Sequence, residues 1–432
     1  MPVSSFPVLV FSLGLAVLGG SVARGADDSR PSPPAGESLT LPAAITEALA
    51  RSPVLDQIEA DTDAARGQVL TARQQPNPEL TFAPGIRRLH EGSSSRREFL
   101  GSIELSRTFF FPGKRELLVS LAERNVELRK LAVAGFRFQL TAAVRRAFTE
   151  LLAAESIVGL RRRQLDSAQD FLAATTMRVE AGYASDFEMI KSRGDVINAR
   201  KLLAAAEGDI ASARVELNTL LGREPAAPLA IQGALDPSAG LTWPDDLVAK
   251  ALAENPGLHV LATQAEVAAL NIRQARLARK PDLTVGPSLE YSPSEQIVGV
   301  RVTLPLLNKD YGRGEVLSAT AEQRKARAEI ERLRREITGA VTQAATRLET
   351  ARRQLALYTP DYLDQLKSVV AQAEHGYAQN ATSLLIYLEA KRTYFDTLAD
   401  YYDTIAGVAR SRADLEAAVG APLVPLPPSS TP

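Results

Sequence analysis

Residues 79–86 read Glu-Leu-Thr-Phe-Ala-Pro-Gly-Ile, a stretch in which apolar and polar side chains alternate. A period of two places successive side chains on opposite faces of a β-strand. The alternation resumes after a polar insertion, so we predict strands at about 79–88 and 98–108. One face is apolar (Leu80, Phe82, Ile86, Phe99, Ile103, Leu105) and the other is polar or small (Glu79, Thr81, Ala83, Ser102, Glu104, Ser106).

The second half of the chain repeats this pattern, and we predict strands at about 282–292 and 296–305. Their apolar face carries Leu283, Val285, Leu289, Tyr291, Val298, Val300, Val302 and Leu304, and their other face carries Asp282, Thr284, Ser288, Glu290, Gly299, Arg301 and Thr303. Strands of about nine to eleven residues are long enough to cross a bilayer at a tilt. The pattern suits a membrane barrel.

Four strands are too few to close a barrel, and an open edge in lipid leaves backbone groups without partners, at several kcal/mol each. Identical chains would therefore share one barrel. An eight-stranded barrel fills its interior with side chains, so a conducting tube favours the twelve strands of a trimer over a dimer. The alternative is a soluble sheet with one wet face. Periodicity alone does not separate the two.

The chain is internally duplicated. Pro78-Glu79-Leu80-Thr81 matches Pro281-Asp282-Leu283-Thr284, and Gly182-Tyr183-Ala184 matches Gly376-Tyr377-Ala378. We predict two repeats, 39–222 and 241–420, joined by a Pro, Gly and Ala linker at 223–240. The repeating unit is far longer than a solenoid repeat, so it indicates a duplicated domain.

Long helices fill the rest of each repeat. Residues 114–223 contain no proline and are rich in strong helix formers. We predict helices at about 54–75, 113–181 and 186–221, and a second long helix at about 311–375. At about 1.5 Å per residue, each of the two long helices would extend roughly 100 Å. Gly182 and Gly376-Tyr377 are the expected reversal points.

The two ends of the chain differ from this pattern. Residues 1–23 contain an apolar run followed by small residues and are expected to be a cleaved secretory signal. Residues 24–38 are expected to be disordered, and the Pro-rich tail 421–432 cannot continue a helix. We expect no transmembrane helix, because no later segment has the unbroken apolar run that such a helix needs.

Composition excludes several classes of function. The chain of 432 residues has 50 Lys and Arg against 51 Asp and Glu, so it lacks the basic field that nucleic-acid binding requires. It has no cysteine and three scattered histidines. We therefore expect no metal site, no cofactor, no nucleic-acid partner and no enzymatic activity.

Two strand exits and two turn motifs carry a family resemblance. The exits are Phe109-Phe110-Phe111-Pro112-Gly113-Lys114-Arg115 and Thr303-Leu304-Pro305-Leu306-Leu307-Asn308-Lys309, and the turn motifs span 182–193 and 376–391. In this order and repetition they resemble the TolC-like outer membrane efflux family, especially its shorter CzcC/CusC-type heavy-metal members. The resemblance covers about residues 39–420. Many family members are lipoproteins, from which this cysteine-free chain departs.

The resemblance implies a mainly α fold with a small membrane β-barrel. It implies a homotrimer with a 12-stranded barrel in the outer membrane, continued by long helical hairpins that form a periplasmic tunnel. The expected partners are outer-membrane lipid, a periplasmic adaptor (membrane-fusion) protein and an inner-membrane pump of the RND type.

Four groups of residues are candidates for these roles. Lumen-lining residues would be Glu79, Thr81, Ser102, Glu104, Asp282, Thr284, Glu290 and Arg301, because charge facing lipid is costly. Membrane-interface residues would be Phe109, Phe110, Phe111, Lys114, Arg115 and Tyr291. By resemblance, Asp186, Glu188 and Glu389 would form a periplasmic gate, and Gly182, Tyr183, Ala184, Ser185, Gly376, Tyr377 and Ala378 would contact the adaptor.

Each assignment has a structural alternative. The strand residues could belong to a solvated sheet face, the aromatic residues to a core, the carboxylates to a solvated helix face and the glycines to simple turns. The function predicted is a passive export duct for small solutes or heavy-metal cations in a tripartite efflux system. The alternatives are a periplasmic coiled-coil scaffold or adaptor-type protein, and the outer-membrane channel of a type I secretion system.

Overall fold

The computed structural model describes residues 38–91, 94–233, 235, 246–308 and 310–420. The expected signal at 1–23, nearly all of the segment at 24–38, residues 234 and 236–240 of the expected linker and the tail at 421–432 lie outside these residues. Everything below concerns the unit from Ser38 onward. None of its described helices combines the length and the apolar composition that crossing a membrane would require.

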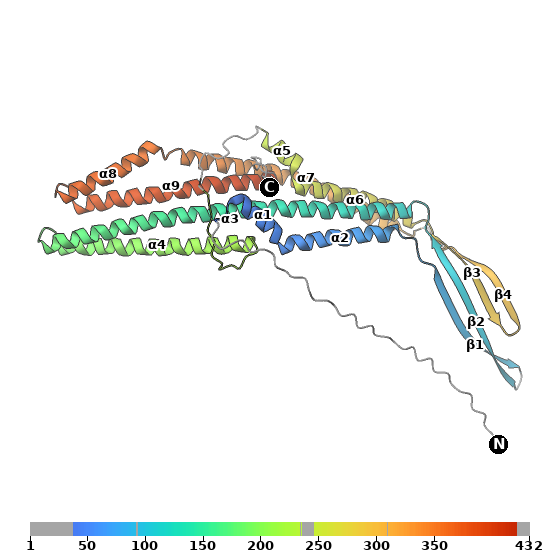
Figure 1. Ribbon diagram of the computed structural model, residues 1–432. Coiled ribbons are helices and arrows are strands. Elements are labelled where there is room, and N and C mark those ends of the chain that lie inside the picture. Colours follow the sequence, from blue (N-terminus) through green and yellow to red (C-terminus); the bar gives the residue numbers. More distant parts are fainter. Residues whose placement is uncertain (1–37, 92–93, 234, 236–245, 309, 421–432) are drawn as a thin grey trace, which may run out of the picture. The chain divides into compact units, whose positions relative to one another are not determined.

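The two repeats have the same order of elements, except that two helices of the second, α7 and α8, stand where the first has α3 alone (Figure 1). The first repeat contains α1 (Leu41–Arg51), α2 (Pro53–Arg73), β1 (Glu79–Glu91), β2 (Ser94–Phe109), α3 (Lys114–Glu180) and α4 (Asp186–Leu220). The second contains α5 (Leu247–Glu254), α6 (Pro256–Ala278), β3 (Leu283–Ser292), β4 (Glu295–Thr303), α7 (Arg313–Leu355), α8 (Pro360–Ala378) and α9 (Leu384–Val419). The described part of the chain is therefore mainly helical, with one small sheet.

Local sequence signals set the helix boundaries. Ser52, Ser185 and Ser383 are N-caps whose hydroxyls accept the N–H groups of Leu55, Glu188 and Ile386. Proline occupies the first turn of α1, α2, α6 and α8, where no helical hydrogen bond is lost. Each of these helices thus begins where its sequence offers a cap or a proline.

Each repeat has its own hydrophobic core. In the first, α1, α3 and α4 bury Ala44, Val144, Leu151, Leu217 and Leu221 against one another. In the second, α5, α7 and α9 bury Ala251, Val341, Leu348, Leu415 and Val419. Leu217 and Leu415, which occupy matching positions in the two repeats, are both fully buried. The duplication is therefore a duplication of packing as well as of sequence.

The four strands form one antiparallel sheet in the order β1-β2-β3-β4. The central β2–β3 pair joins the two repeats, with Ile103 opposite Leu289 and Phe109 opposite Leu283. The β1–β2 hairpin runs from Glu79 to its last pair, Glu91 with Ser94. It therefore extends past β3–β4, which pairs with it only as far as Gly101 opposite Tyr291.

The second long helix differs from expectation. We expected one helix over about 311–375, but the structure has two, α7 ending at Leu355 and α8 beginning at Pro360. Pro360 lacks an N–H and its ring clashes with the carbonyl four residues earlier, so it begins a helix but does not continue one. Thr359 caps the new helix by accepting the Tyr362 N–H. By contrast, α3 has no proline and runs unbroken for 67 residues.

Candidate functional site

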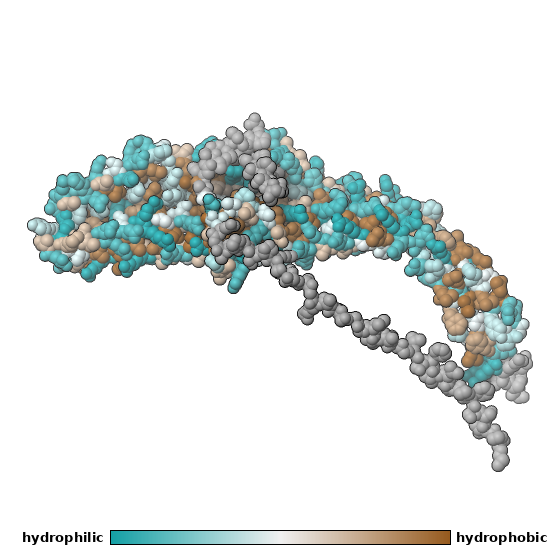
Figure 2. Space-filling model, viewed as in Figure 1, coloured by the Kyte–Doolittle hydropathy of each residue, from teal (hydrophilic) through white to brown (hydrophobic). Residues whose placement is uncertain are grey.

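One face of the sheet is a continuous apolar surface. The register places Phe82, Ile103, Leu289 and Val298 opposite one another across all four strands. All four are exposed, with 63% of Phe82 and 81% of Val298 accessible in the protomer. Figure 2 shows hydrophobic side chains gathered over these strands. An exposed apolar surface of this extent in a soluble monomer is unusual and marks an interaction with lipid or protein.

The other face carries the carboxylates of the sheet and the arginines that pair with them. Arg301 on β4 reaches Glu104 on β2 at 3.3 Å and Glu290 on β3 at 3.0 Å. The hydroxyls of Thr108 and Thr284 lie 2.9 Å apart. Seven of the eight expected lumen residues lie on this face according to the strand register. They are Glu79, Thr81, Ser102, Glu104, Thr284, Glu290 and Arg301.

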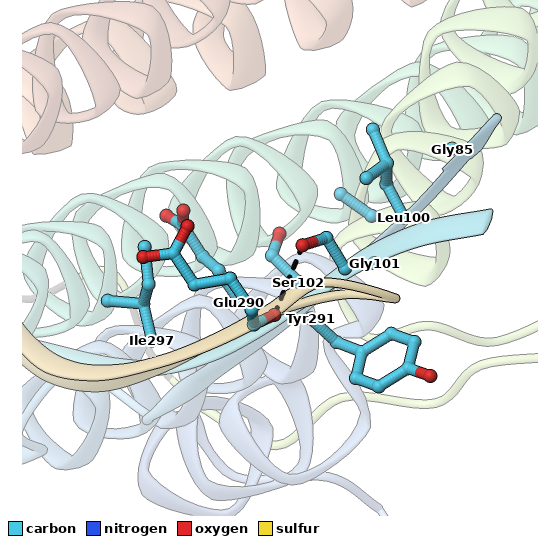
Figure 3. Close-up of a pocket in the computed structure, with 10 residues that line it drawn as sticks. Gly85, Leu100, Gly101, Ser102, Glu290, Tyr291 and Ile297 are labelled. Atoms are coloured by element: carbon cyan, nitrogen blue, oxygen red, sulfur yellow. Dashed lines mark hydrogen bonds between the residues drawn. The ribbon is translucent and has the colours of Figure 1, made fainter. Parts of the chain in front are cut away.

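Figure 3 shows the alternation directly, because the Glu290 side chain lies on one side of β3 and the Tyr291 ring on the other. Near the end of the β3–β4 hairpin the charged face is hollowed. The hollow has a volume of about 370 Å³ and is lined by Gly85, Ser102, Glu290 and Ile297, among others. The two sides of the sheet thus differ in chemistry residue by residue.

Asp282, the eighth residue expected on this face, lies elsewhere. It comes one residue before β3 and accepts the Phe111 N–H at 2.7 Å and the Lys114 ammonium at 2.8 Å. Lys114 also donates to the Lys280 carbonyl at 2.7 Å. The expectation that Lys114 would extend to lipid headgroups therefore does not fit this geometry. Asp282 and Lys114 instead join the exits of β2 and α6 where the sheet meets the helices.

The other expected interface residues lie at the same level of the sheet or on its apolar face. Phe109 and Phe110 are exposed at the end of β2, and Tyr291 is exposed on β3. Phe111 is partly covered, with the Lys280 ammonium 6.0 Å from its ring. Arg115 lines a hollow between this exit and the end of α2. The phenylalanines thus form a cluster where apolar strand meets polar helix.

At the other end of the helices, the α3–α4 and α8–α9 turns lie side by side (Figure 1). The first turn has the expected geometry, with Gly182 at a φ of 78° and Tyr183 75% exposed. Ala184 follows, and Ser185 caps α4. A left-handed residue at this position closes the helix end through two backbone hydrogen bonds.

The second turn lies at a different place from the one expected. Asn380, at a φ of 58°, supplies the left-handed conformation. Its backbone bonds repeat those of the first turn, since Tyr183 N–H donates to Arg178 O and Ala381 N–H donates to Gly376 O. The match of Gly182 with Gly376 was therefore wrong, because Gly182 corresponds to Asn380.

Gly376 and Tyr377 are consequently helical residues of α8, and Ala378 is its last residue. A Cβ on Gly376 would lie 2.3 Å from the Thr382 hydroxyl, so a larger residue here would displace the Thr382 side chain. Tyr377 is 8% exposed. The geometry does not suit Tyr377 as a surface contact for a partner, whereas Tyr183 is well placed for one.

Tyr377 ties the two hairpins together. Its hydroxyl donates to Glu188 of α4 at 2.7 Å. The Arg178 guanidinium of α3 lies 4.7 Å from its ring centroid and donates to the carbonyls of Tyr377 and Ala378. Burial, aided by the hydrogen bond to Glu188, raises the pKa of Tyr377 to about 12. The phenol is therefore neutral and donating at physiological pH.

A buried cation lies next to this contact. Lys391 of α9 is 4% exposed and donates to the Ser167 carbonyl of α3 at 2.7 Å. Its ammonium lies 5.6 Å from the Phe171 ring and 5.7 Å from the Tyr387 ring. Burial lowers the pKa of Lys391 and raises the pKa of Tyr387. Arg178 and Lys391 were missed as tip residues in the sequence, because the hydrogen-bond partners of each lie in the other repeat.

Two of the three expected gate carboxylates line one hollow. Glu188 and Glu389 both line a space of about 890 Å³ between α4 and α9. Asp186 is the first residue of α4. Among the described residues, no cluster of three or more His, Cys, Asp or Glu could hold a metal ion.

Comparisons with known proteins agree with this architecture. A family model described as outer membrane efflux protein matches residues 44–223 and 247–421, one match in each repeat. The cobalt-zinc-cadmium resistance protein CzcC of Cupriavidus metallidurans is 28% identical over 392 residues, covering 88% of this chain and 90% of CzcC. The probable outer membrane lipoprotein SilC of Salmonella typhimurium is 24% identical, covering 82% of this chain and 79% of SilC.

Solved structures share the fold at low identity. CusC superimposes with a TM-score of 0.75 at 19% identity, covering 88% of this chain and 92% of CusC. The open state of MtrE from Neisseria gonorrhoeae gives 0.71 at 19% identity, covering 89% of each chain. The family model spans most of the chain and matches it twice. The chain belongs to the outer membrane efflux protein family.

Proposed function

We propose that the protein is a trimeric export duct of the outer membrane, in which three chains pool their strands into one 12-stranded barrel. The observation that carries the proposal is the two-faced sheet, with exposed apolar residues on one side and ion-paired Glu104, Glu290 and Arg301 on the other. The apolar face would contact lipid and the charged face would line a water-filled lumen. A trimer satisfies both open strand edges.

The helices would form the periplasmic part of the duct. We place the α3–α4 and α8–α9 turns at its periplasmic tip, where an adaptor protein and an inner-membrane pump would dock. The exposed residues of the first turn, Gly182 to Ser185, support this role better than the packed residues Gly376 and Tyr377. The duct itself would be passive, with energy supplied by the pump.

The tip contacts support a gate. Tyr377–Glu188 and Arg178 link the hairpins within one protomer, so breaking them would leave α8 held to α3 by the apolar contact of Tyr377 with Phe171. Three copies of Glu188 and Glu389 would place carboxylates around the opening and attract cations. We propose heavy-metal cations as the cargo, because CzcC, 28% identical to this chain, is a cobalt-zinc-cadmium resistance protein.

The test is conductance together with cellular resistance. The full-length mature protein, extracted from outer membranes in detergent, should elute as a trimer and form ion-conducting pores in planar bilayers. A strain lacking the protein should become more sensitive to cobalt, zinc or cadmium. A monomer that is stable without detergent and forms no pores would contradict the duct and favour a periplasmic scaffold. Unchanged metal sensitivity would contradict the cargo alone.

A further inference from the structure

The end of the β1–β2 hairpin carries two arginines that directly face each other. Arg88 on β1 is the register partner of Arg97 on β2. Both lie beyond Gly101, the last β2 residue paired with β3, so they project past the β3–β4 hairpin. Like charges directly opposite each other in an antiparallel pair are destabilising unless something compensates them.

These arginines share the apolar face of the sheet. Arg88 follows Ile86 by two residues and Arg97 precedes Phe99 by two, so each continues the apolar row of its strand. Both side chains are exposed, and among residues with described side chains none forms an ion pair with either.

On the opposite face at the same level, the described side chains form an ion pair. Arg87 pairs with Glu98 at 2.8 Å, and Glu98 is 8% exposed. One step along each strand therefore separates Arg87, which is paired, from Arg88, for which the described side chains supply no ion-pair partner. Arg87 and Arg88 carry the same charge and differ in the face of the sheet on which they lie.

The height of the arginines follows from strand geometry. From Phe109 to Phe99 the apolar face of β2 extends ten steps of about 3.4 Å, roughly 34 Å along the strand, with one charged side chain, Arg107, next to Phe109 at the helical end. At a tilt of about 40°, this is close to the apolar band of roughly 25 Å found on outer-membrane barrels. Arg97 lies two residues further, roughly 5 Å higher, at the level of lipid headgroups rather than hydrocarbon.

We propose that Arg88 and Arg97 form a binding site for a phosphate group of an outer-leaflet lipid. Guanidinium groups bind phosphate through paired charge-assisted hydrogen bonds, and two opposed side chains about 5 Å apart at Cβ can hold one phosphate between them. A lipid is the occupant because the site continues the surface that faces the acyl chains. This inference rests on the proposed function, which places that face against lipid.

Native mass spectrometry of the assembled protein in detergent tests the site. The probes are diphosphoryl lipid A, phosphatidylcholine and inorganic phosphate. Wild-type protein should retain lipid A in preference to phosphatidylcholine, and the double variant R88Q/R97Q should bind lipid A at least tenfold more weakly. R88K/R97K should be intermediate, because it keeps the charge but loses the planar fork.

Arg87→Gln is the matched control, since it removes the same charge from the neighbouring position on the other face. It should bind lipid A like the wild type. The proposal is overturned if R88Q/R97Q retains lipid A, if R87Q loses it equally, or if millimolar inorganic phosphate displaces the lipid completely. Planar-bilayer conductance separates the two proposals, because pores that still conduct while lipid preference is absent contradict the lipid site and leave the duct intact.

Discussion

The two repeats follow the same order of elements but are built with different continuity. In the first, α3 runs without a break from the sheet to the tip and packs against α1, α2, α4, α6 and α9. In the second, the corresponding path is divided into α7 and α8, and α8 packs mainly along α9. This difference indicates that the unbroken helix α3 organises the protomer, whereas the corresponding path in the second repeat, α7 and α8, tolerates a break.

The break between α7 and α8 leaves α8 with a separate contact near each of its ends. Tyr358, just before α8, contacts the Tyr401 ring of α9 with centroids 5.7 Å apart. Tyr377, near the other end of α8, carries the hydrogen bond to Glu188. The contacts at both ends of α8 are thus separate from the core around Val341 and Leu348, to which no buried residue of α8 belongs.

The largest effect is expected from giving α3 the proline that α8 carries. Arg162 in α3 occupies the position that matches Pro360 when Leu217 is matched with Leu415, and its side chain is exposed. Arg162→Pro removes a helical hydrogen bond and introduces a clash, at a cost of about 3 kcal/mol or more. The trimer yield in detergent should fall sharply.

Two controls frame this result. Arg162→Ala should leave assembly and the thermal midpoint nearly unchanged, and Pro360→Ala should shift stability by less than about 1 kcal/mol. If Arg162→Pro assembled normally, the continuity of α3 would have no structural importance and the two repeats would not differ in any way that matters to assembly.

The next effect concerns the strand pair that joins the repeats. An added Cβ on Gly286 of β3 would lie 2.0 Å from the Leu105 carbonyl oxygen of β2. Gly286→Ala should therefore destabilise the assembled protein by about 1 to 3 kcal/mol, since backbone must move. Gly299→Ala is the matched control, because its nearest neighbour, the Ser288 hydroxyl, is 3.8 Å away. Thermal melts of the two variants should differ clearly, and equal midpoints would contradict the close approach of β2 and β3.

A smaller effect is expected at the tip. Tyr377→Phe removes the donor to Glu188 and should cost about 1 to 2 kcal/mol. The pKa of Tyr377 is raised in the folded protein from 10.0 to about 12. Its contribution to stability is therefore fully present below the unfolded value and is lost as the pH rises through the folded one. The wild-type midpoint should fall over this range more than that of Tyr377→Phe.

Tyr183→Phe serves as the control, since this tyrosine is 75% exposed in the other turn. It should not alter the pH profile. In planar bilayers Tyr377→Phe should also conduct more than the wild type, because one link between the hairpins is lost. Equal conductance would show that this contact does not close the tip.

Much of the sheet and of α3 could be predicted because their signals are local. Period two alone assigns faces to Phe82 and Glu104, and the absence of proline predicts one long helix. Asp282 was placed on the charged face by extending the alternation one residue beyond the strand, where its carboxylate instead meets Lys114. The break at Pro360 was missed because the symmetry of the repeats was weighted above a proline that the sequence displays.

The tip was predicted less well, for a physical reason. A turn needs a residue with positive φ, and glycine was matched to glycine although Asn380 also adopts that conformation. The contacts of Lys391 with Ser167 and of Tyr377 with Glu188 each join one repeat to the other. Such pairs depend on how the hairpins pack, which no local pattern in the sequence records.

The smallest effect distinguishes the two turns themselves. Gly182→Asn should cost less than about 1 kcal/mol, because asparagine adopts the left-handed conformation, whereas Gly182→Ala should cost about 1 to 2 kcal/mol. Asn380→Gly should relieve the backbone but lose the contact between the Asn380 side chain and Arg178, a net cost within about 1 kcal/mol.

The sign of the Asn380→Gly change decides what the second turn depends on. A lower thermal midpoint would mean that the side-chain contact with Arg178 outweighs the backbone relief, so the turn is held partly by the other hairpin. A higher midpoint would contradict this and show that only the positive φ matters, as at Gly182, where no heavy atom lies within 4 Å of an added Cβ. The two turns share the bond from the residue after the left-handed one, Tyr183 or Ala381, to the carbonyl five residues earlier, and the second adds the bond from Thr382 N–H to Gly376 O. The Asn380→Gly change leaves these backbone groups in place, so its sign reports the Arg178 contact against the backbone relief.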